Sequence, residues 1–559
     1  MEEESLEQRL INEHQQEETS SKRNKGRSFI TLPFIIANES FEKVASYGLT
    51  TNMIVYLMND YKMSLAKGQN LLFLWTAAIN FLPIVGAFVA DSYLGRFLTI
   101  GLGSIFSLLG MIMLWMTTIV PEAKTTAGPY ALLLSSFLFI AIGAGGVRPC
   151  SLAFGADQVD QREYHKNRTI LETFFNWYYA CGCFSVVIAM TVIVYIQDHW
   201  GWAIGFGVPV ILMFLSTLFL FLAAPYYVMN QVKRSLFSSL IRVAVVAFRN
   251  RKMNVQPLGS SVHQYYLEKD STVIVPSDKL RCLNKACIIQ DRDQDIGPDG
   301  MAKNPWTLCT VEEVEELKSL IRVLPIWSTG VIMSIHASQS SFGLLQAESM
   351  DRHLGPNFEV PAASFITFST IVIVVWIPIY DRILLPLASW VYGKPVTLSV
   401  KLRMGIGLFC AFMSMLVAGI VENIRRERAI AQGFMDNNGP AVLMSAFWLV
   451  PQYIFSGLAE AFNAIGQNEF FYTEMPKSMS SIATCLFGVG MAVANLLASL
   501  IFNLVNDITK RGGEESWVSS NVNEGHYDYY YWFLATICSF NMLYYMICCW
   551  CYGPVAGEV

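Results

Sequence analysis

The sequence predicts an all-α membrane protein with twelve transmembrane helices in two six-helix bundles. Hydrophobic residues make up 53% of the 559-residue chain and charged residues only 15%, which is too apolar for a soluble protein of this length. Apolar segments of about 20 residues, long enough to cross the hydrocarbon core of a bilayer, recur between short polar breaks. One long polar stretch in the middle of the chain separates six such segments from six more.

The predicted spans follow one another in two groups of six. The first group covers residues 29–57, 71–90, 97–120, 130–154, 174–196 and 202–226. The second group covers residues 317–338, 362–385, 402–421, 441–461, 482–505 and 529–551. These spans divide the chain into five parts: an N-terminal tail (1–28), an N-terminal six-helix bundle (29–226), a linker (227–314), a C-terminal six-helix bundle (315–551) and a C-terminal tail (552–559).

The linker is expected to lie on the cytosolic side of the membrane. Its first part, "VKRSLFSSLIRVAVVAFRNRK" (232–252), mixes basic and apolar side chains as an interfacial amphipathic helix does. Near its end, the spacing of Thr310 and Glu313 predicts a helix-capping box at the start of the seventh span. Lys and Arg are more frequent in the short loops that share a side with both termini. The sequence therefore predicts a multi-pass integral membrane protein with both termini in the cytosol.

Three ionisable residues, Glu39, Glu42 and Lys43, interrupt the first predicted span. Each ionised side chain at the centre of a span costs about 2.5–3.5 kcal/mol on insertion scales, so the three groups need water or partners. Offsets of three and four residues place them on one helix face, pointing together into the bundle. Their protonation would depend on what else occupies the site, which predicts a proton-coupling device. The alternative is an ion pair that only fixes helix packing.

Several stretches resemble the proton-coupled oligopeptide transporters, and in particular their plant branch, the nitrate and peptide transporter family. The ionisable cluster of the first span matches that family's ExxER pattern, with Lys43 in place of Arg. "GAFVADSYLGRF" (86–97) resembles the major facilitator loop between the second and third helices. Family signatures are matched by "GAGGVRPCSLAFGADQ" (143–158), "FFNWYY" (174–179), "LPIW" (324–327) and "GLAEAFNAIGQNEFFYTEMP" (457–476). "LPFIIANESFEKVASYGL" (32–49) is most similar to the first plant subfamily, and the resemblance spans nearly the whole chain.

The resemblance implies the major facilitator fold, in which two six-helix bundles close alternately around a midplane site while protons drive solute uptake. Arg148 stands where the family usually carries Lys, beside Pro149, which breaks the backbone hydrogen-bond ladder. Its expected partners are Glu42 and Glu460. Because arginine stays charged, it would be a fixed counter-charge or anion fork, and protonation of Glu460 would release the bundles from one another. One alternative is that Arg148 and Glu460 form a purely structural ion pair. The other is that the Glu460 carboxylate is hydrogen-bonded by a nearby hydroxyl or backbone group.

His336 resembles in position the histidine that binds nitrate in a plant nitrate transporter of this family. A histidine gains charge near physiological pH and can attract a monoanion, although a hydrogen-bonded packing role is equally open. Tyr47 is all that remains of the FxYYG stretch found in peptide-transporting members, and Lys43 lacks the planar fork of Arg. Nitrate is therefore favoured over di- or tripeptides as the substrate. Larger organic anions, plant hormones and a nitrate sensor with the same fold stay as alternatives.

Asp91, Gly95 and Arg96 are expected to form an inter-helix charge relay, a gate that stabilises the outward-facing state. Thr99 stands in a place that resembles a regulatory phosphothreonine of the plant nitrate transporter, which makes a kinase an expected partner. The alternative is a threonine whose hydroxyl only hydrogen-bonds at the start of a helix.

Other classes of protein find no support in the sequence. It contains no nucleophile elbow, phosphate loop or metal-spaced cluster, so we expect neither an enzyme nor a cofactor or metal site. The net charge of −5, with basic stretches that fit a membrane interface, makes nucleic acid an unexpected partner. The sequence favours a proton-coupled symporter, most simply of nitrate at low affinity, in the plasma membrane, which is the family's commonest location.

Overall fold

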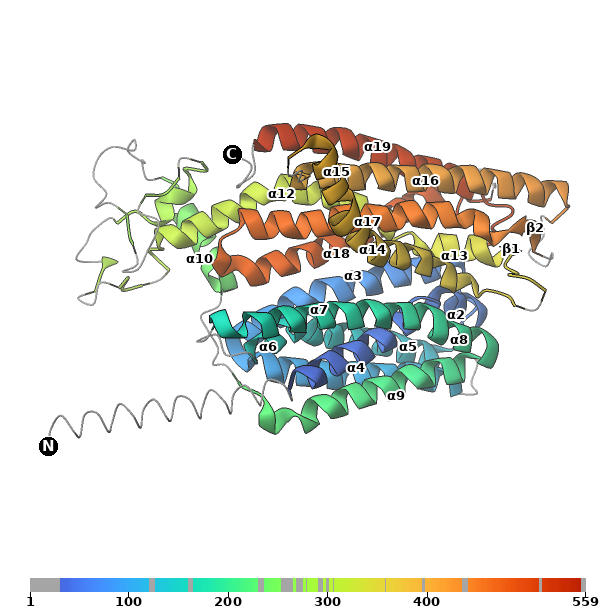
Figure 1. Cartoon of the computed structure of the whole chain (residues 1–559), viewed down its shortest axis with the longest axis horizontal. Helices are drawn as coiled ribbons and strands as arrows, with labels where there is room; N and C mark the ends of the chain where they lie inside the picture. Colours follow the sequence, from blue (N-terminus) through green and yellow to red (C-terminus); the bar gives the residue numbers. More distant parts are fainter. Residues whose placement is uncertain are drawn as a thin grey trace.

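The computed structural model contains two helical bundles lying side by side, with the linker beyond one end of them (Figure 1). The described residues are 31–119, 126–158, 164–229, 236–252, 265–267, 275–277, 279–289, 295–297, 301–304, 306–356, 358–394, 398–434, 441–511 and 515–553. We call the end that carries linker helix α10 (Leu236–Arg249) the linker end, and the end that carries β1 (Met350–Asp351) and β2 (Val442–Ser445) the strand end.

The N-terminal bundle begins with a helix at residues 31–50, which continues after a turn as α2 (Met53–Asn59). Its other helices are α3 (Leu65–Val89), α4 (Arg96–Ile119), α5 (Ala127–Val147), α6 (Ser151–Asp157), α7 (Tyr164–Ile188), α8 (Val194–Trp200) and α9 (Trp202–Leu222). Short helical turns extend α3, join α7 to α8 and follow α9: η1 (Ala90–Leu94), η3 (Ala189–Ile193) and η4 (Ala224–Tyr226).

The C-terminal bundle comprises α12 (Val311–Ala337), α13 (Ser340–Glu348), α14 (Thr367–Ile379), α15 (Leu385–Tyr392), α16 (Val400–Ala431), α17 (Val450–Glu474), α18 (Ser480–Thr509) and α19 (Tyr527–Tyr552). Its short turns are η7 (Ala362–Ile366), η8 (Tyr380–Leu384), η9 (Ala446–Leu449) and η10 (Lys477–Met479), and the linker adds η6 (Leu283–Ala286). Strands β1 and β2 pair in parallel. The predicted capping box is present at the start of α12, where Thr310 and Glu313 each accept a hydrogen bond from the other's backbone N–H at 3.2 Å.

Ten helices among the described residues are long and apolar enough to cross a membrane. Two predicted spans are not among them: the first, predicted at 29–57, whose helix covers residues 31–50, and the tenth, predicted at 441–461. The tenth span was predicted too early in the sequence. Residues 442–449 form β2 and η9, and the helix itself, α17, begins at Val450 and ends at Glu474. At 25 residues α17 exceeds the hydrocarbon core of about 30 Å. Both helices carry ionisable residues of the central cavity, which lowers their hydropathy, and their crossing of the membrane stays a prediction.

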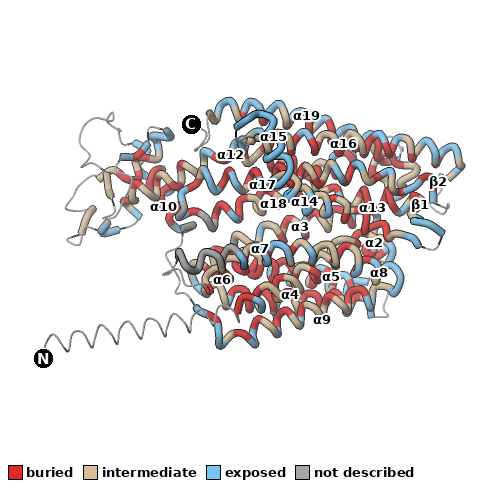
Figure 2. The backbone as a smooth tube through the Cα atoms, viewed as in Figure 1, coloured by how far each residue is buried: buried red, intermediate tan, exposed pale blue. Residues whose placement is uncertain are grey.

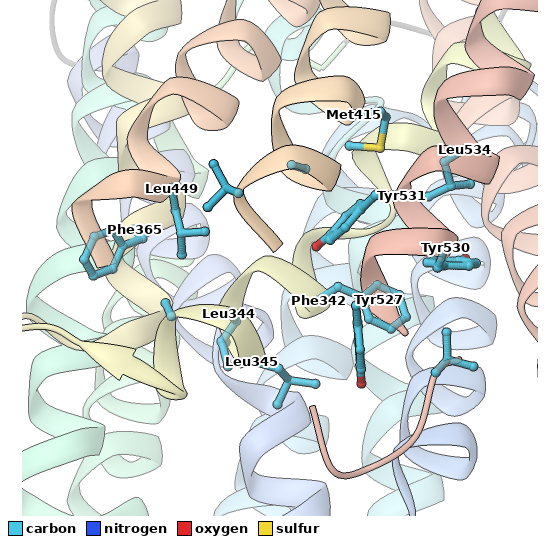
Figure 3. Close-up of a cluster of buried hydrophobic side chains, with 14 of the residues drawn as sticks. Phe342, Leu344, Leu345, Phe365, Met415, Leu449, Tyr527, Tyr530, Tyr531 and Leu534 are labelled. Atoms are coloured by element: carbon cyan, nitrogen blue, oxygen red, sulfur yellow. The ribbon is translucent and has the colours of Figure 1, made fainter. Parts of the chain in front are cut away.

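Buried residues run along the interior of both bundles (Figure 2). The largest apolar cluster includes residues of both halves near the strand end, among them Ile54 and Phe73 with Phe342 and the tyrosines drawn in Figure 3. The Phe502 ring lies 6.2 Å from that of Phe73 and 5.8 Å from that of Phe342. Near the linker end, the buried clusters of the two bundles are separate from each other. The bundles are therefore closed against one another by apolar packing at the strand end.

Glycines allow the helices of the N-terminal bundle to approach closely. A Cβ atom added at Gly86 in α3 would lie 1.9 Å from the carbonyl oxygen of Gly145 in α5, far inside van der Waals contact. Small residues at such contacts let helix backbones pack directly, which is one source of helix association in membranes.

We expect Gly86→Ala to destabilise the protein by about 1–3 kcal/mol or more, because the obstructing atom is backbone and cannot move aside. Gly128→Ala, near the start of α5, is the matched control, since a Cβ there meets no atom within 4 Å. Thermal unfolding of the purified variants measures the difference. Equal melting temperatures for the two variants would show that α3 and α5 do not pack as described.

Candidate functional site

A central cavity between the bundles brings together the three predicted substrate-binding residues and two of the four predicted proton-coupling residues. It has two adjoining parts, the histidine chamber of about 360 Å³, lined by Lys43 and His336, and the arginine chamber of about 310 Å³, lined by Arg148. Tyr47 from the N-terminal bundle and Glu460 from the C-terminal bundle line both chambers. Charges that lie far apart in the sequence therefore share one cavity.

The first helix presents its three ionisable residues on one face, as their spacing predicts. The Nζ atom of Lys43 lies 3.3 Å from Oε1 of Glu39, and the Ser46 hydroxyl donates a 2.6 Å hydrogen bond to Oε1 of Glu42. Glu39 and Glu42 are only 5% and 2% exposed, whereas Lys43 reaches the cavity surface. Sequence reasoning missed Ser46, although its i+4 position relative to Glu42 was the available signal.

Helix α7 accommodates the ammonium group of Lys43. The Nζ atom lies 5.5 Å from the centroid of the Tyr178 ring, a cation–π distance. A Cβ atom at Gly182, one helical turn further on, would lie 2.6 Å from Nζ, so only glycine leaves this space free. The "FFNWYY" stretch thus supplies the aromatic ring that contacts the ammonium group of Lys43.

Arg148 lies at a break between two helices. Helix α5 ends at Val147 and α6 begins at Ser151, as expected from Pro149, which has no backbone N–H to continue the helix. The guanidinium group is close enough to Glu42 to interact with it electrostatically. Among the described residues no ion pair joins Arg148 to Glu460, and Glu460 has no hydrogen-bond or ion-pair partner. The expected bridge across the cavity is thus absent in this state, and so is the hydroxyl or backbone partner of the alternative.

His336 lies near the end of α12 and is 5% exposed. Its Nε2 atom is 3.2 Å from Oγ of Ser414, and the Ser414 hydroxyl itself donates to the backbone carbonyl of Gln452 at 2.9 Å. Because the serine proton is already committed, Nε2 of the histidine must be the donor in their contact. The neutral ring therefore carries its proton on Nε2 and leaves an acceptor lone pair on Nδ1, which has no hydrogen-bond partner among the described residues.

The predicted gate residues meet at the linker end of the N-terminal bundle. Gly95 adopts a φ of +76°, a left-handed conformation that suits glycine, between η1 and α4. Arg96 lies 3.9 Å from Asp91 but only 2.6 Å from Asp157 in α6, which the sequence reasoning missed. Both ion pairs of Arg96 therefore join elements of the N-terminal bundle.

The C-terminal bundle repeats this arrangement. Turn η8 carries Asp381 as η1 carries Asp91, and the first turn of α16 carries Arg403 as that of α4 carries Arg96. Arg403 lies 2.5 Å from Glu469 near the end of α17. The two halves thus share an arginine–carboxylate pair at the linker end, which agrees with internal repeats in transporter folds.

Thr99 is 5% exposed, and its hydroxyl donates a 2.9 Å hydrogen bond to the carbonyl oxygen of Gly95. This is the hydrogen bond at a helix start that the alternative interpretation described. A kinase could reach the hydroxyl only after the first turn of α4 opens, so modification of Thr99 stays a prediction.

A buried ion pair near the strand end was missed by sequence reasoning. Glu422 and Arg425 in α16 are fully buried, with Arg425 Nη2 2.8 Å from Glu422 Oε1. Gln346 donates to Glu422 at 2.7 Å, and the hydroxyl of Tyr531, a residue that lines the histidine chamber, donates to Gln346 at 3.0 Å. The sequence span ended at residue 421, whereas α16 continues to Ala431. The i,i+3 spacing of opposite charges was the signal for that continuation.

Two membrane-embedded helical bundles around a cavity with charges from both sides define a secondary transporter of the major facilitator type. The sequence profile of the POT family (PTR2) matches residues 97–518. The chain is 56% identical to Protein NRT1/PTR FAMILY 1.2 of Arabidopsis thaliana, over 96% of this chain and 91% of that protein. It is 54% identical to Protein NRT1/PTR FAMILY 1.1 of the same plant, over 97% and 94%. The chain therefore belongs to the POT family and to its plant NRT1/PTR branch.

Solved structures give the same fold. An auto-inhibited POT family peptide transporter superimposes with a TM-score of 0.70 at 19% identity, covering 94% of this chain and 98% of that one. A POT family transporter in complex with 5-aminolevulinic acid superimposes with a TM-score of 0.61 at 15% identity, covering 92% and 95%. These likenesses confirm the predicted transporter fold.

Proposed function

We propose that this chain is a proton-coupled symporter that takes up nitrate at low affinity by alternating access. The observation that carries the proposal is the central cavity, where His336, Lys43 and Arg148 supply positive or protonatable groups and Glu460 supplies a carboxylate. We further propose the plasma membrane as its location and the cytosol for the linker end, from the Lys and Arg bias of the short loops.

The anion would bind next to His336. Nδ1 of the neutral ring is an acceptor and repels an anion, but after protonation it becomes a donor that an anion oxygen can accept. A buried imidazolium without a counter-ion is costly, and the arriving anion offsets that cost. The hydrogen-bond direction set by Ser414 therefore makes anion binding depend on a proton.

Protons would move through the carboxylates of both bundles. Glu42 is buried beside Lys43 and Arg148, whose charges respond to an anion in the cavity. Glu460 faces the cavity with no ion-pair partner in the described part of the chain, so it can take up a proton without breaking such a pair. A salt bridge between Glu460 and Arg148 would then form in another state of the transport cycle. In the outward-facing state, the gate formed by Asp91, Gly95 and Arg96 would close the linker end.

The number of protons decides the electrical behaviour. One elementary charge crossing a membrane potential of 100 mV is worth about 2.3 kcal/mol, so nitrate with one proton gains nothing electrically while nitrate with two is driven inward. Glu42 with Glu39, and His336, supply two protonation sites.

Expression in oocytes clamped at negative potential, at about pH 5.5, tests the proposal. We expect nitrate to evoke an inward current that shrinks at neutral pH. Silence to nitrate together with a current on adding an organic acid would contradict nitrate as the substrate and keep the transport mechanism.

The dimensions of the cavity favour one second candidate, a larger organic anion such as a plant hormone. The two chambers of about 360 and 310 Å³ are far larger than a four-atom anion requires, and apolar side chains such as Ile366 and Tyr453 line both. The oocyte experiment separates this candidate from nitrate directly. A nitrate sensor with the same fold would give no current with nitrate. A di- or tripeptide transporter would give a current with peptides.

A further inference from the structure

A groove on the outer surface of the molecule lies apart from the central cavity. It has a volume of about 820 Å³ and sits at the strand end, between α3, α5 and α18. Its lining includes Lys62, Lys67, Asn70, Leu74 and Asn503. The residues of α3 that line the central cavity, such as Phe73 and Thr76, lie on the other face of that helix. The groove therefore opens toward the surroundings of the protein.

The two lysines give the groove a positive charge that no ion pair within the described part of the chain neutralises. Neither Lys62 nor Lys67 forms an ion pair or hydrogen bond with any described residue, and none of the residues lining the groove is acidic. The ammonium group of lysine is a compact, strongly hydrated charge, and as such it can bind a phosphate group.

Apolar surface continues from the lysines toward the membrane interior. Leu74 lies seven residues along α3 from Lys67, about 10 Å deeper at 1.5 Å per residue, and is 54% exposed. On α18 the neighbouring Leu500 and Leu504 are 63% and 56% exposed. A charged rim above an apolar strip is complementary to a phospholipid, with its phosphate at the lysines and its acyl chain along the leucines.

The groove also follows the seam between the bundles. Asn70 of α3 and Asn503 of α18 donate hydrogen bonds to one another at 2.5 and 3.0 Å, and Ser499 donates to Asn70 at 2.7 Å. Interhelical hydrogen bonds between side chains contribute to helix association in membranes. Any molecule held in this groove contacts both bundles at the end where they are closed.

We propose that this groove binds an anionic phospholipid, and that the bound lipid stabilises the state closed at the strand end. The lipid contacts Lys62 and Lys67 on one side of the seam and α18 on the other. Opening the strand end would separate these walls and release it, so the lipid and the closed state favour each other. The proposal is independent of the transported substrate.

Thermal unfolding of the purified full chain in detergent tests the proposal with three additions: phosphatidylglycerol, phosphatidylcholine or inorganic phosphate. Phosphatidylglycerol is expected to raise the melting temperature by about 2 °C or more, and the other two to have little effect. The Lys62→Gln/Lys67→Gln double variant loses this shift. The matched control is Lys510→Gln/Arg511→Gln, which removes the same charge from exposed residues at the end of α18 that do not line the groove.

Native mass spectrometry of the same samples gives a second readout that does not depend on stability. We expect bound phosphatidylglycerol on the wild type and the control, and its loss from the double variant. Full retention of lipid and of the thermal shift in the double variant would overturn the proposal. An equal shift with phosphatidylcholine, or with inorganic phosphate alone, would also overturn it, because the site would then recognise something other than an anionic lipid.

Discussion

Glu42→Gln is expected to abolish nitrate accumulation driven by a pH gradient while leaving exchange of nitrate across the membrane intact. The amide resembles a protonated carboxyl group and accepts the hydrogen bond from Ser46, so the helix keeps its packing. It cannot release a proton, and the transporter loses its coupling to the gradient. A pH gradient of one unit is worth about 1.4 kcal/mol per proton, which corresponds to a tenfold concentration ratio, so we expect concentrative uptake into proteoliposomes to fall about tenfold or more.

The matched control is Glu427→Gln, which removes an exposed carboxylate from α16 near the strand end. It should accumulate nitrate as the wild type does. If Glu42→Gln loses exchange as well as accumulation, the residue is required for binding or folding and its assignment to proton coupling is wrong.

His336→Ala is expected to have a comparably large effect on nitrate binding. The variant removes the only histidine that lines the cavity within the described part of the chain, and with it the donor formed when Nδ1 is protonated. The loss of one charge-assisted hydrogen bond should weaken binding at about pH 5.5 by tenfold or more. Stabilisation of the purified protein by nitrate at acidic and neutral pH measures this difference.

Two further variants make the histidine test specific. His353→Ala, at an exposed site near β1, should bind nitrate normally. Ser414→Ala removes the acceptor that holds the ring proton on Nε2, so Nδ1 can carry the proton in the neutral ring. Nitrate binding to Ser414→Ala should therefore depend less on pH than in the wild type. An unchanged pH dependence would contradict the role given to Ser414.

The fold could be predicted from the sequence because membranes restrict the choices. In a bilayer every backbone polar group must be satisfied within the protein, and a helix does so within a single segment, so long apolar stretches predict helices. Ten of the twelve expected spans correspond to helices that satisfy length and composition. The first helix differs in carrying three charged residues, and α17 differs in carrying Glu460 together with side-chain amides. The one-face placement of Glu39, Glu42 and Lys43 follows from helix periodicity alone.

The partners of the site residues could not be predicted in the same way. Arg96 pairs more closely with Asp157 than with Asp91, and His336 contacts Ser414, because helices distant in sequence bring these groups together. The missing bridge between Arg148 and Glu460 depends on the conformational state, which a sequence does not specify. Such contacts require the packed structure.

The most direct test of the account uses proteoliposomes that contain the purified chain and a pH-sensitive dye. Nitrate is added outside at equal pH on both sides, with the membrane potential clamped by potassium and valinomycin. Proton-coupled symport predicts that the interior acidifies as nitrate enters, and that Glu42→Gln abolishes the acidification. Entry of nitrate without any change in the internal pH would contradict the central claim that this cavity carries an anion together with protons.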